Sequence, residues 1–243
     1  RIKNVLIFFL AMVMLGACRD KKSEKKEEEN IQQENTFVNP LKTEGAQCWA
    51  NYYDGWYYYM QEAVDRLELW RTRDITDLEH AEHKVIWIPK DPSNAHHLWG
   101  PEIHPIAGKW YVYYAASDDN MDNHQLFVLE NSSADPFEGE FELKGRISTD
   151  KNNNWAIHPN VFEHRGAWYM TWSGWQSRRV STEHQCIYIA KMKNPWTLES
   201  DRVLLSKPEF EWERQWINPD GSKTAYTHTI CLQWDEFQVP TDD

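Results

Sequence analysis

A glycine-aromatic pattern that recurs three times constrains the fold of this chain more than any other feature. It spans residues 54–59, 108–114 and 166–172, and its marker residues Trp56, Trp110 and Trp168 are separated by 54 and 58 positions. Each copy contains a short strand, a tight turn with glycine and then an aromatic strand, which is the pattern of a β-hairpin. Self-similarity at such a period predicts a repeat architecture.

Each copy continues with two further predicted strands. An apolar run follows over residues 67–70, 126–129 and 187–190, and after a turn comes a fourth short strand near 85–88, 141–147 and 203–205. Four strands in a unit of about 55 residues are typical of a propeller blade. The chain is therefore predicted to be all-β and to form a β-propeller. The alternative is a β-sandwich in which the tryptophan spacing is accidental.

The composition supports a packed, β-rich domain and excludes some partners. Aromatic residues make up 14% of the chain and include 14 Trp, which is too many for a disordered chain. Tryptophan suits strand packing, and its flat ring also suits stacking on the face of a sugar. The formal net charge of −12 argues against nucleic acid and against an anionic membrane surface, because both need a basic patch.

No cofactor and no metal site are predicted. Cys48, Cys186 and Cys231 are scattered, with neither a disulfide framework nor metal-ligand spacing. The acidic loop over residues 118–123 lacks the regular ligand spacing and the glycine of a calcium loop.

The first 36 residues are expected to lie outside the folded domain. Residues 1–18 combine a basic start, an apolar stretch and small residues before Cys18, as in a bacterial lipoprotein signal whose cysteine carries the lipid. The alternative is an ordinary signal peptide followed by a chance cysteine. Residues 19–36 are almost entirely polar or charged and are predicted to be a flexible tether. The domain over 37–243 would then lie at the bacterial cell envelope, periplasmic or cell-surface, touching the membrane only through its lipid anchor.

Three polar residues precede the marker tryptophans at similar distances. Gln47 lies 9 residues before Trp56, Glu102 lies 8 before Trp110, and His158 lies 10 before Trp168. The first strand of each propeller blade lines the central channel, so these side chains are predicted to converge on one pocket. The alternative for each is an ordinary hydrogen-bonded strand residue.

Several motifs carry a resemblance to a known family. The most specific is Leu98-Trp99-Gly100-Pro101-Glu102-Ile103-His104 followed by residues 108–116, and further matches lie at 128–131, 134–136, 161–164, 172–175 and 194–196. With these motifs the chain resembles the five-bladed β-propeller glycosidases of glycoside hydrolase family 43, above all the arabinan- and arabinoside-acting branches. The resemblance implies hydrolysis of O-glycosyl bonds in arabinose- or xylose-containing plant polysaccharides.

The resemblance also implies an inverting mechanism with a general base, a modulator of the acid's pKa and a general acid. The family's base is an Asp at the position of Gln47, and an amide cannot take a proton from water. The modulator is an Asp at the position of His158. The general acid is a Glu expected after Tyr226, and no residue there is assigned to it, Glu236 included.

The length of the chain is short for this fold. The resemblance runs from about Phe37 to Trp216 and stops after Tyr226, and 208 residues follow Asn35 (243 less 35). Five blades need roughly 275 residues at about 55 each. About three blades and part of a fourth are therefore expected, in a domain that is C-terminally truncated by a frameshift or as a genuine short variant.

The candidate sugar-binding residues are Trp99, Trp155, Trp175, Glu102 and His104. The three rings are candidate sugar platforms, with strand and core packing as the alternative for each. Glu102 is expected to hold sugar hydroxyls, and His104 lies two residues further along the same strand and face. Three functions stay open: a hydrolase, a catalytically inactive carbohydrate-binding protein, and a truncated propeller without function.

Overall fold

The structure, a computed structural model, describes residues 37–177, 185–210, 215–217 and 223–228, the last two stretches by their backbone alone. The chain divides into two compact units, Arg1–Leu41 and Lys42–Asp243. The described residues of the first unit, 37–41, form no regular element. The second unit holds all the strands discussed below. No helix among the described residues is long and apolar enough to cross a membrane.

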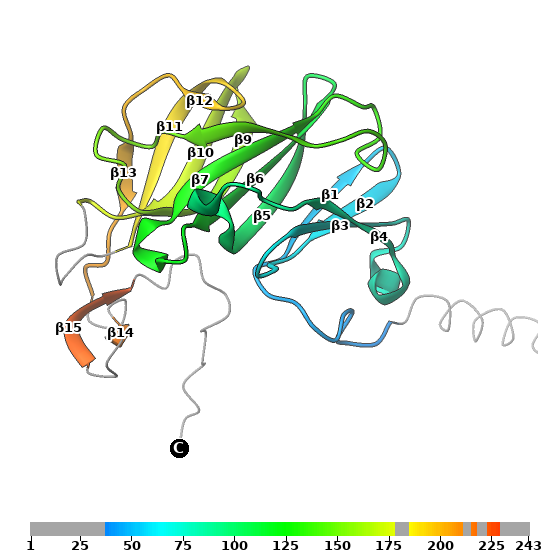
Figure 1. Ribbon diagram of the computed structural model, residues 1–243, viewed down its shortest axis with the longest axis horizontal. Helices are drawn as coiled ribbons and strands as arrows, with labels where there is room; N and C mark the ends of the chain where they lie inside the picture. Colours follow the sequence, from blue (N-terminus) through cyan, green and yellow to red (C-terminus); the bar gives the residue numbers. More distant parts are fainter. Residues whose placement is uncertain (1–36, 178–184, 211–214, 218–222, 229–243) are drawn as a thin grey trace, which may run out of the picture. The chain divides into compact units, whose positions relative to one another are not determined.

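The first sheet is made of four consecutive antiparallel strands (Figure 1). They are β1 (Trp49–Tyr53), β2 (Trp56–Met60), β3 (Leu67–Thr72) and β4 (Glu82–Trp87), with the 3₁₀ turn η1 (Ile75–His80) between the last two. A hairpin turn of two residues joins β1 to β2, and both of them, Asp54 and Gly55, have positive φ. That conformation defines the type I′ turn that fits the twist of paired strands.

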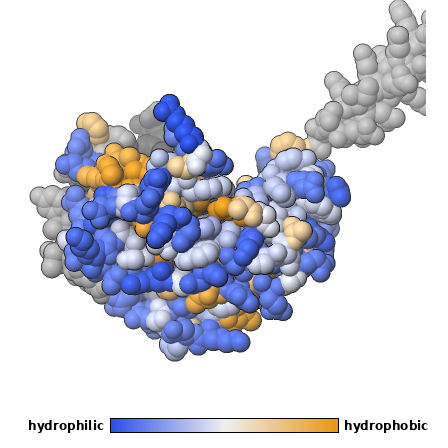
Figure 2. All heavy atoms as spheres, turned by 90° about the horizontal axis from the view of Figure 1, so that it is seen from above, coloured by the Kyte–Doolittle hydropathy of each residue, from blue (hydrophilic) through white to orange (hydrophobic). Residues whose placement is uncertain are grey.

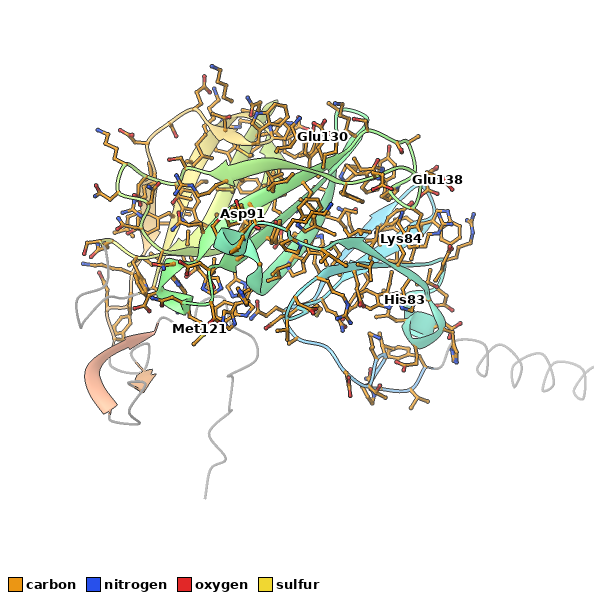
Figure 3. All side chains as sticks on the ribbon, in the orientation of Figure 1. His83, Lys84, Asp91, Met121, Glu130 and Glu138 are labelled. Atoms are coloured by element: carbon orange, nitrogen blue, oxygen red, sulfur yellow. The ribbon has the colours of Figure 1, made fainter. Side chains whose placement is uncertain are left out.

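The second sheet repeats the same order. It contains β5 (His96–Ile106), β6 (Lys109–Ser117), β7 (Gln125–Asn131) and β8 (Glu142–Ile147), with the short 3₁₀ turns η2 (Pro92–Asn94) before β5 and η3 (Met121–Asn123) before β7. Its first hairpin turns at Ala107 and Gly108, again with positive φ at both. In Figure 3, Lys84 of β4 lies near Glu138 of the β7–β8 connection, and the Lys84 ammonium donates to the Phe137 carbonyl at 2.6 Å.

The third sheet contains β9 (Ala156–His164), β10 (Ala167–Gly174) and β11 (Cys186–Asn194), with β12 (Thr197–Leu198) and β13 (Val203–Ser206) both paired to β11. The turn at Arg165 and Gly166 is the third of the type I′ hairpins. A separate antiparallel pair, β14 (Gln215–Ile217) and β15 (Lys223–His228), follows. The strands predicted near 85–88, 141–147 and 203–205 correspond to β4, β8 and β13.

Two hydrophobic cores flank the second sheet. Along β6, Val112, Tyr114 and Ala116 point into the core shared with the first sheet, and Tyr111, Tyr113 and Ala115 point into the core shared with the third. Burial on both faces explains why β6 reads as an uninterrupted apolar run. On the face seen in Figure 2, most side chains are hydrophilic and the apolar groups form separate patches.

These sheets are propeller blades and not the layers of a sandwich. Each consists of consecutive strands, and the middle sheet is covered on both faces by its neighbours in the chain, whereas a two-layer sandwich buries one face of each sheet. The all-β prediction and the propeller prediction are confirmed. The first blade is β1–β4, the second β5–β8 and the third β9–β13.

Candidate functional site

A cavity of about 440 Å³ lies where the inner strands of the three blades meet. Its walls come from the segment Gly45–Trp49 that leads into β1, from β5, from β9 and from Thr171 on β10. Gln47, Glu102 and His158 all line it, so the structure brings together the three polar residues that the repeat singled out.

The repeat position of Glu102 differs from the one expected. Counted from the turn glycines Gly55, Gly108 and Gly166, the residues eight positions earlier are Gln47, Gly100 and His158. These three share a left-handed backbone, with φ of +48°, +52° and +50°. Gly100, and not Glu102, is therefore the counterpart of Gln47 and His158.

Glu102 is instead the counterpart of Trp49 and Asn160, two residues further along each inner strand. In the strand register Trp49 pairs with Met60, Glu102 with Tyr113 and Asn160 with Thr171, and each partner stands five residues after its turn glycine. The expected match was wrong because it treated distances of 9, 8 and 10 residues to the marker tryptophans as one position. Counted to the turn glycines, Glu102 lies 6 residues away, whereas Gln47 and His158 both lie 8 away.

Irregular pairing accompanies the left-handed residues on β5 and β9. The register of β5 against β6 shifts between Trp99 and Glu102, and the register of β9 against β10 shifts between Ile157 and Asn160, opposite Ser173 and Thr171. Such bulges bend a strand and redirect a side chain, and they are common beside binding sites. Gly100-Pro101 and His158-Pro159 occupy these two irregular stretches.

Glu102 is held by two neighbours. Its Oε2 lies 3.0 Å from His104 Nε2 and accepts a hydrogen bond of 3.0 Å from Asn160 Nδ2 on the third blade. Its side chain is 14% exposed. Burial raises the pKa of the Glu102 carboxyl above its ordinary value, and the contacts with His104 and Asn160 oppose that rise. The carboxyl group is thus oriented from two blades.

His104 acts on Glu102 from behind and does not line the cavity. Its ring is buried, with its centroid 5.1 Å from the Trp49 ring and 5.8 Å from the Tyr113 ring. The strand spacing placed it on the same face as Glu102, and the 3.0 Å contact shows that the two side chains meet. Its place suits the positioning of a carboxyl group better than direct contact with a ligand.

Gln47 brings an amide where the family resemblance expects a base. Its Oε1 is buried and has no hydrogen-bond partner within the described part of the chain. An unpaired buried acceptor costs about 1–3 kcal/mol. Among the described residues that line the cavity, Glu102 carries the single carboxyl group.

None of the three candidate sugar platforms lines this cavity. Trp155 and Trp175 stack with centroids 4.9 Å apart, are only 5% and 3% exposed, and belong to the core between the second and third blades. Trp155 Nε1 donates to the Met121 carbonyl at 2.8 Å. Trp99 stacks on His124 at 4.0 Å. These contacts favour the packing role for all three rings.

Sequence reasoning missed Gly100, Asn160 and Thr171 as cavity residues. A signal for two of them was present, because Gly100-Pro101-Glu102 and His158-Pro159-Asn160 share a central proline. Cys48 is exposed at the cavity wall. Within the described ranges no group of three or more His, Cys, Asp or Glu side chains could hold a metal ion. Cys18, Cys231 and Glu236 lie outside the described residues.

Comparison with known proteins identifies relatives over most of the chain. The family model for glycosyl hydrolases family 43 matches residues 25–229. The chain is 37% identical over 182 residues to an extracellular exo-alpha-(1->5)-L-arabinofuranosidase of Streptomyces chartreusis, covering 73% of this chain and 55% of that protein. It is 34% identical over 167 residues to alpha-L-arabinofuranosidase 43 of Humicola insolens, covering 66% of this chain and 34% of that protein. The chain thus spans about half or less of the length of these relatives.

Solved structures agree on the fold. The crystal structure of an alpha-L-arabinofuranosidase from Lactobacillus brevis superposes with a TM-score of 0.67 at 32% identity, over 73% of this chain and 58% of that one. An endo-arabinase from Bacteroides thetaiotaomicron superposes with a TM-score of 0.59 at 15% identity, over 78% of this chain and 66% of that one.

Proposed function

Because the chain belongs to glycosyl hydrolase family 43, we propose that its cavity binds an arabinose unit of a plant saccharide and that the described groups bind this unit without cleaving it. Relatives at 37% and 34% identity bear the name arabinofuranosidase, which supports arabinose over other sugars. The volume of about 440 Å³ falls within the range of small-ligand pockets, about 300–1,000 Å³.

The polar groups of the cavity suit a neutral sugar. A carboxylate, two amides and an imidazole from Glu102, Gln47, Asn160 and His158 supply both donors and acceptors for hydroxyl groups. Asn160 and His104 already orient the carboxyl group of Glu102, so less order has to be imposed when the sugar binds.

The presence of a single carboxyl group among the described residues that line the cavity carries the proposal. Inverting hydrolysis needs one carboxylic acid to protonate the leaving oxygen and one carboxylate to activate water, roughly 6.5–9.5 Å apart. Glu102 supplies one carboxyl group. Gln47, in the base position that the resemblance implies, has no proton-accepting group for water at neutral pH.

Arabinofuranosidase activity is the second candidate. The names of the relatives favour it, since both enzymes quoted above are arabinofuranosidases. Under this hypothesis the chain releases arabinose from arabinosides or, as an extension, acts on xylose-containing saccharides.

Titration calorimetry combined with a hydrolysis assay separates the two candidates. Arabino-oligosaccharides, with xylo-oligosaccharides for comparison, are titrated into the full chain, and release of arabinose is followed with the same sugars. We expect binding without release, weakened on the order of tenfold in Glu102→Gln because a hydrogen bond to a charged group is lost. The exposed Glu140→Gln serves as the control variant.

Two results would decide against the proposal. Arabinose release by the unaltered chain establishes the hydrolase instead. Absence of heat with both sugar series, from protein that melts cooperatively, removes sugar binding. The Gln47→Asp variant is assayed in the same way as the unaltered chain. Turnover gained on restoring a carboxylate would place the base at residue 47.

We also propose that the domain over residues 37–243 is carried at the cell envelope by a lipid on Cys18, with 19–36 as its tether. Two relatives are named extracellular, which is consistent with an envelope location. Cys18→Ser is expected to move the protein from the membrane fraction to the soluble fraction. Retention of the variant in the membrane would contradict the lipid anchor.

A further inference from the structure

Gly100 has no side chain, and the imidazole of His158 lies in the space that a side chain at residue 100 would occupy. A Cβ placed on Gly100 would lie 2.7 Å from His158 Nδ1 and 3.4 Å from its Cε1, and the first of these separations is closer than real Cβ atoms come. The same Cβ would lie 3.6 Å from Gln47 Oε1, an ordinary contact. The imidazole therefore occupies the space that any other residue at position 100 would need.

The three residues involved are equivalent positions of the repeat. Gln47, Gly100 and His158 each stand eight residues before a turn glycine, share the left-handed backbone, and line one cavity. Each inner strand thus directs one position toward the same space. Two of these positions carry long polar side chains, and the third carries none.

We propose that Gly100 is a positioning residue for the sugar site: the absence of its side chain gives the His158 imidazole its place in the cavity. An imidazole at position 158 and a side chain at position 100 then exclude each other in this arrangement. The consequence for sugar affinity rests on the proposed function, whereas the placement of the ring does not.

Conformation and contact have to be separated in the test, because φ of +52° at Gly100 disfavours a side chain even where space is free. The chain offers a matched control. Gly108 has φ of +77°, and a Cβ added there meets nothing within 4 Å. Gly108→Ala therefore reports the conformational effect alone, whereas Gly100→Ala adds the contact with His158.

The experiment combines proton NMR of the His158 Hε1 signal with thermal melts. The signal is assigned by its loss in His158→Ala. We expect Gly100→Ala to move this signal and Gly108→Ala to leave it in place. Gly100→Ala should lower the melting temperature by roughly 2–12 °C, the range for overpacking in a domain of this size. In the His158→Ala background the same change should cost no more than Gly108→Ala does.

The proposal requires both results. An unmoved His158 signal overturns it, and so does an equal loss of melting temperature with and without the imidazole. If Gly100→Ala does not fold, the double variant with His158→Ala should fold, and failure of both overturns the proposal.

Sugar binding is measured on the same variants. Gly100→Ala is expected to weaken arabino-oligosaccharide binding on the order of tenfold, as the displaced imidazole no longer meets the sugar. The double variant should bind as His158→Ala does. If the unaltered chain binds no sugar, the proposed function fails, and the NMR signal and melting temperatures still decide the role of Gly100.

Discussion

Replacing Glu102 with glutamine should stabilise the protein while weakening sugar binding. The carboxyl group is 14% exposed, and burial raises its pKa although His104 and Asn160 both favour the charged form. The raised pKa means that the loss of hydration destabilises the charged carboxylate more than the contacts with His104 and Asn160 stabilise it. Glutamine keeps an oxygen that can accept from both neighbours and removes the buried charge.

The sign of the pH dependence follows from the direction of the shift. A carboxyl group whose pKa is raised on folding holds its proton more tightly in the folded state. Its favourable contribution is therefore complete below the ordinary value of 4.5 and is lost as the pH rises through the folded value. The contribution of Glu102 to the free energy of unfolding therefore becomes less favourable as the pH rises toward 7. Glu102→Gln should raise that free energy by about 1 kcal/mol, as stabilising changes at functional sites commonly do.

Thermal melts across pH test this reasoning. A gain of about 1 kcal/mol corresponds to a rise in melting temperature of roughly 2–4 °C for a domain of this size. We expect the rise at pH 7 and its disappearance near pH 4, at which Glu102 is itself neutral. Glu140→Gln, an exposed change of the same kind, should show no such trend. A Glu102→Gln variant that melts at or below the unaltered protein at pH 7 would refute the argument, since the charge would then be net favourable.

Three further predictions concern contacts within and between the blades. Arg202 donates to two backbone carbonyls, each at 2.9 Å, so Arg202→Ala should cost about 3 kcal/mol in thermal melts, with only partial recovery in Arg202→Lys. Trp155→Phe should lower the free energy of unfolding by about 1–3 kcal/mol in denaturant melts and leave sugar affinity in calorimetry unchanged, because its ring is core. Trp49 Nε1 and Asn51 Nδ2 both donate to the Ile103 carbonyl, at 3.2 and 3.3 Å, so a double-mutant cycle of Trp49→Phe and Asn51→Ala should show a double variant worse than the sum of the two.

The fold could be predicted because its signals are local. Type I′ turns need positive φ at two successive residues, so Gly55, Gly108 and Gly166 mark each hairpin in the sequence itself. The alternation of side chains along β6 does not reveal its two cores, since both faces are apolar. The spacing of the repeat supplied the order of the strands, and the structure supplied which faces they cover.

The site was predicted less completely, since it depends on register. Counting from the marker tryptophans paired Glu102 with Gln47 and His158, because distances of 8, 9 and 10 residues were treated as equivalent, although Glu102 lies two residues nearer to its turn glycine than the other two. A shift of this kind is invisible in a list of aromatic residues. Tryptophan chemistry likewise fits both packing and sugar stacking. Only burial separates the two, as it does for Trp155 at 5% exposure.

The backbone of the cavity argues that its polar groups serve a ligand. Gln47 and His158 hold left-handed φ values of +48° and +50°, which cost about 1 kcal/mol or more for each residue other than glycine. Glutamine has no special tolerance for this region, unlike histidine or asparagine. Neither residue carries a carboxylate, so the strained backbone does not position the Asp base or the Asp modulator that the family resemblance implies. It aims an amide and an imidazole into one cavity beside Glu102. A cavity built only for packing would be more stable with glycine at residue 47, so these combined costs favour recognition of a polar ligand as the role of the site.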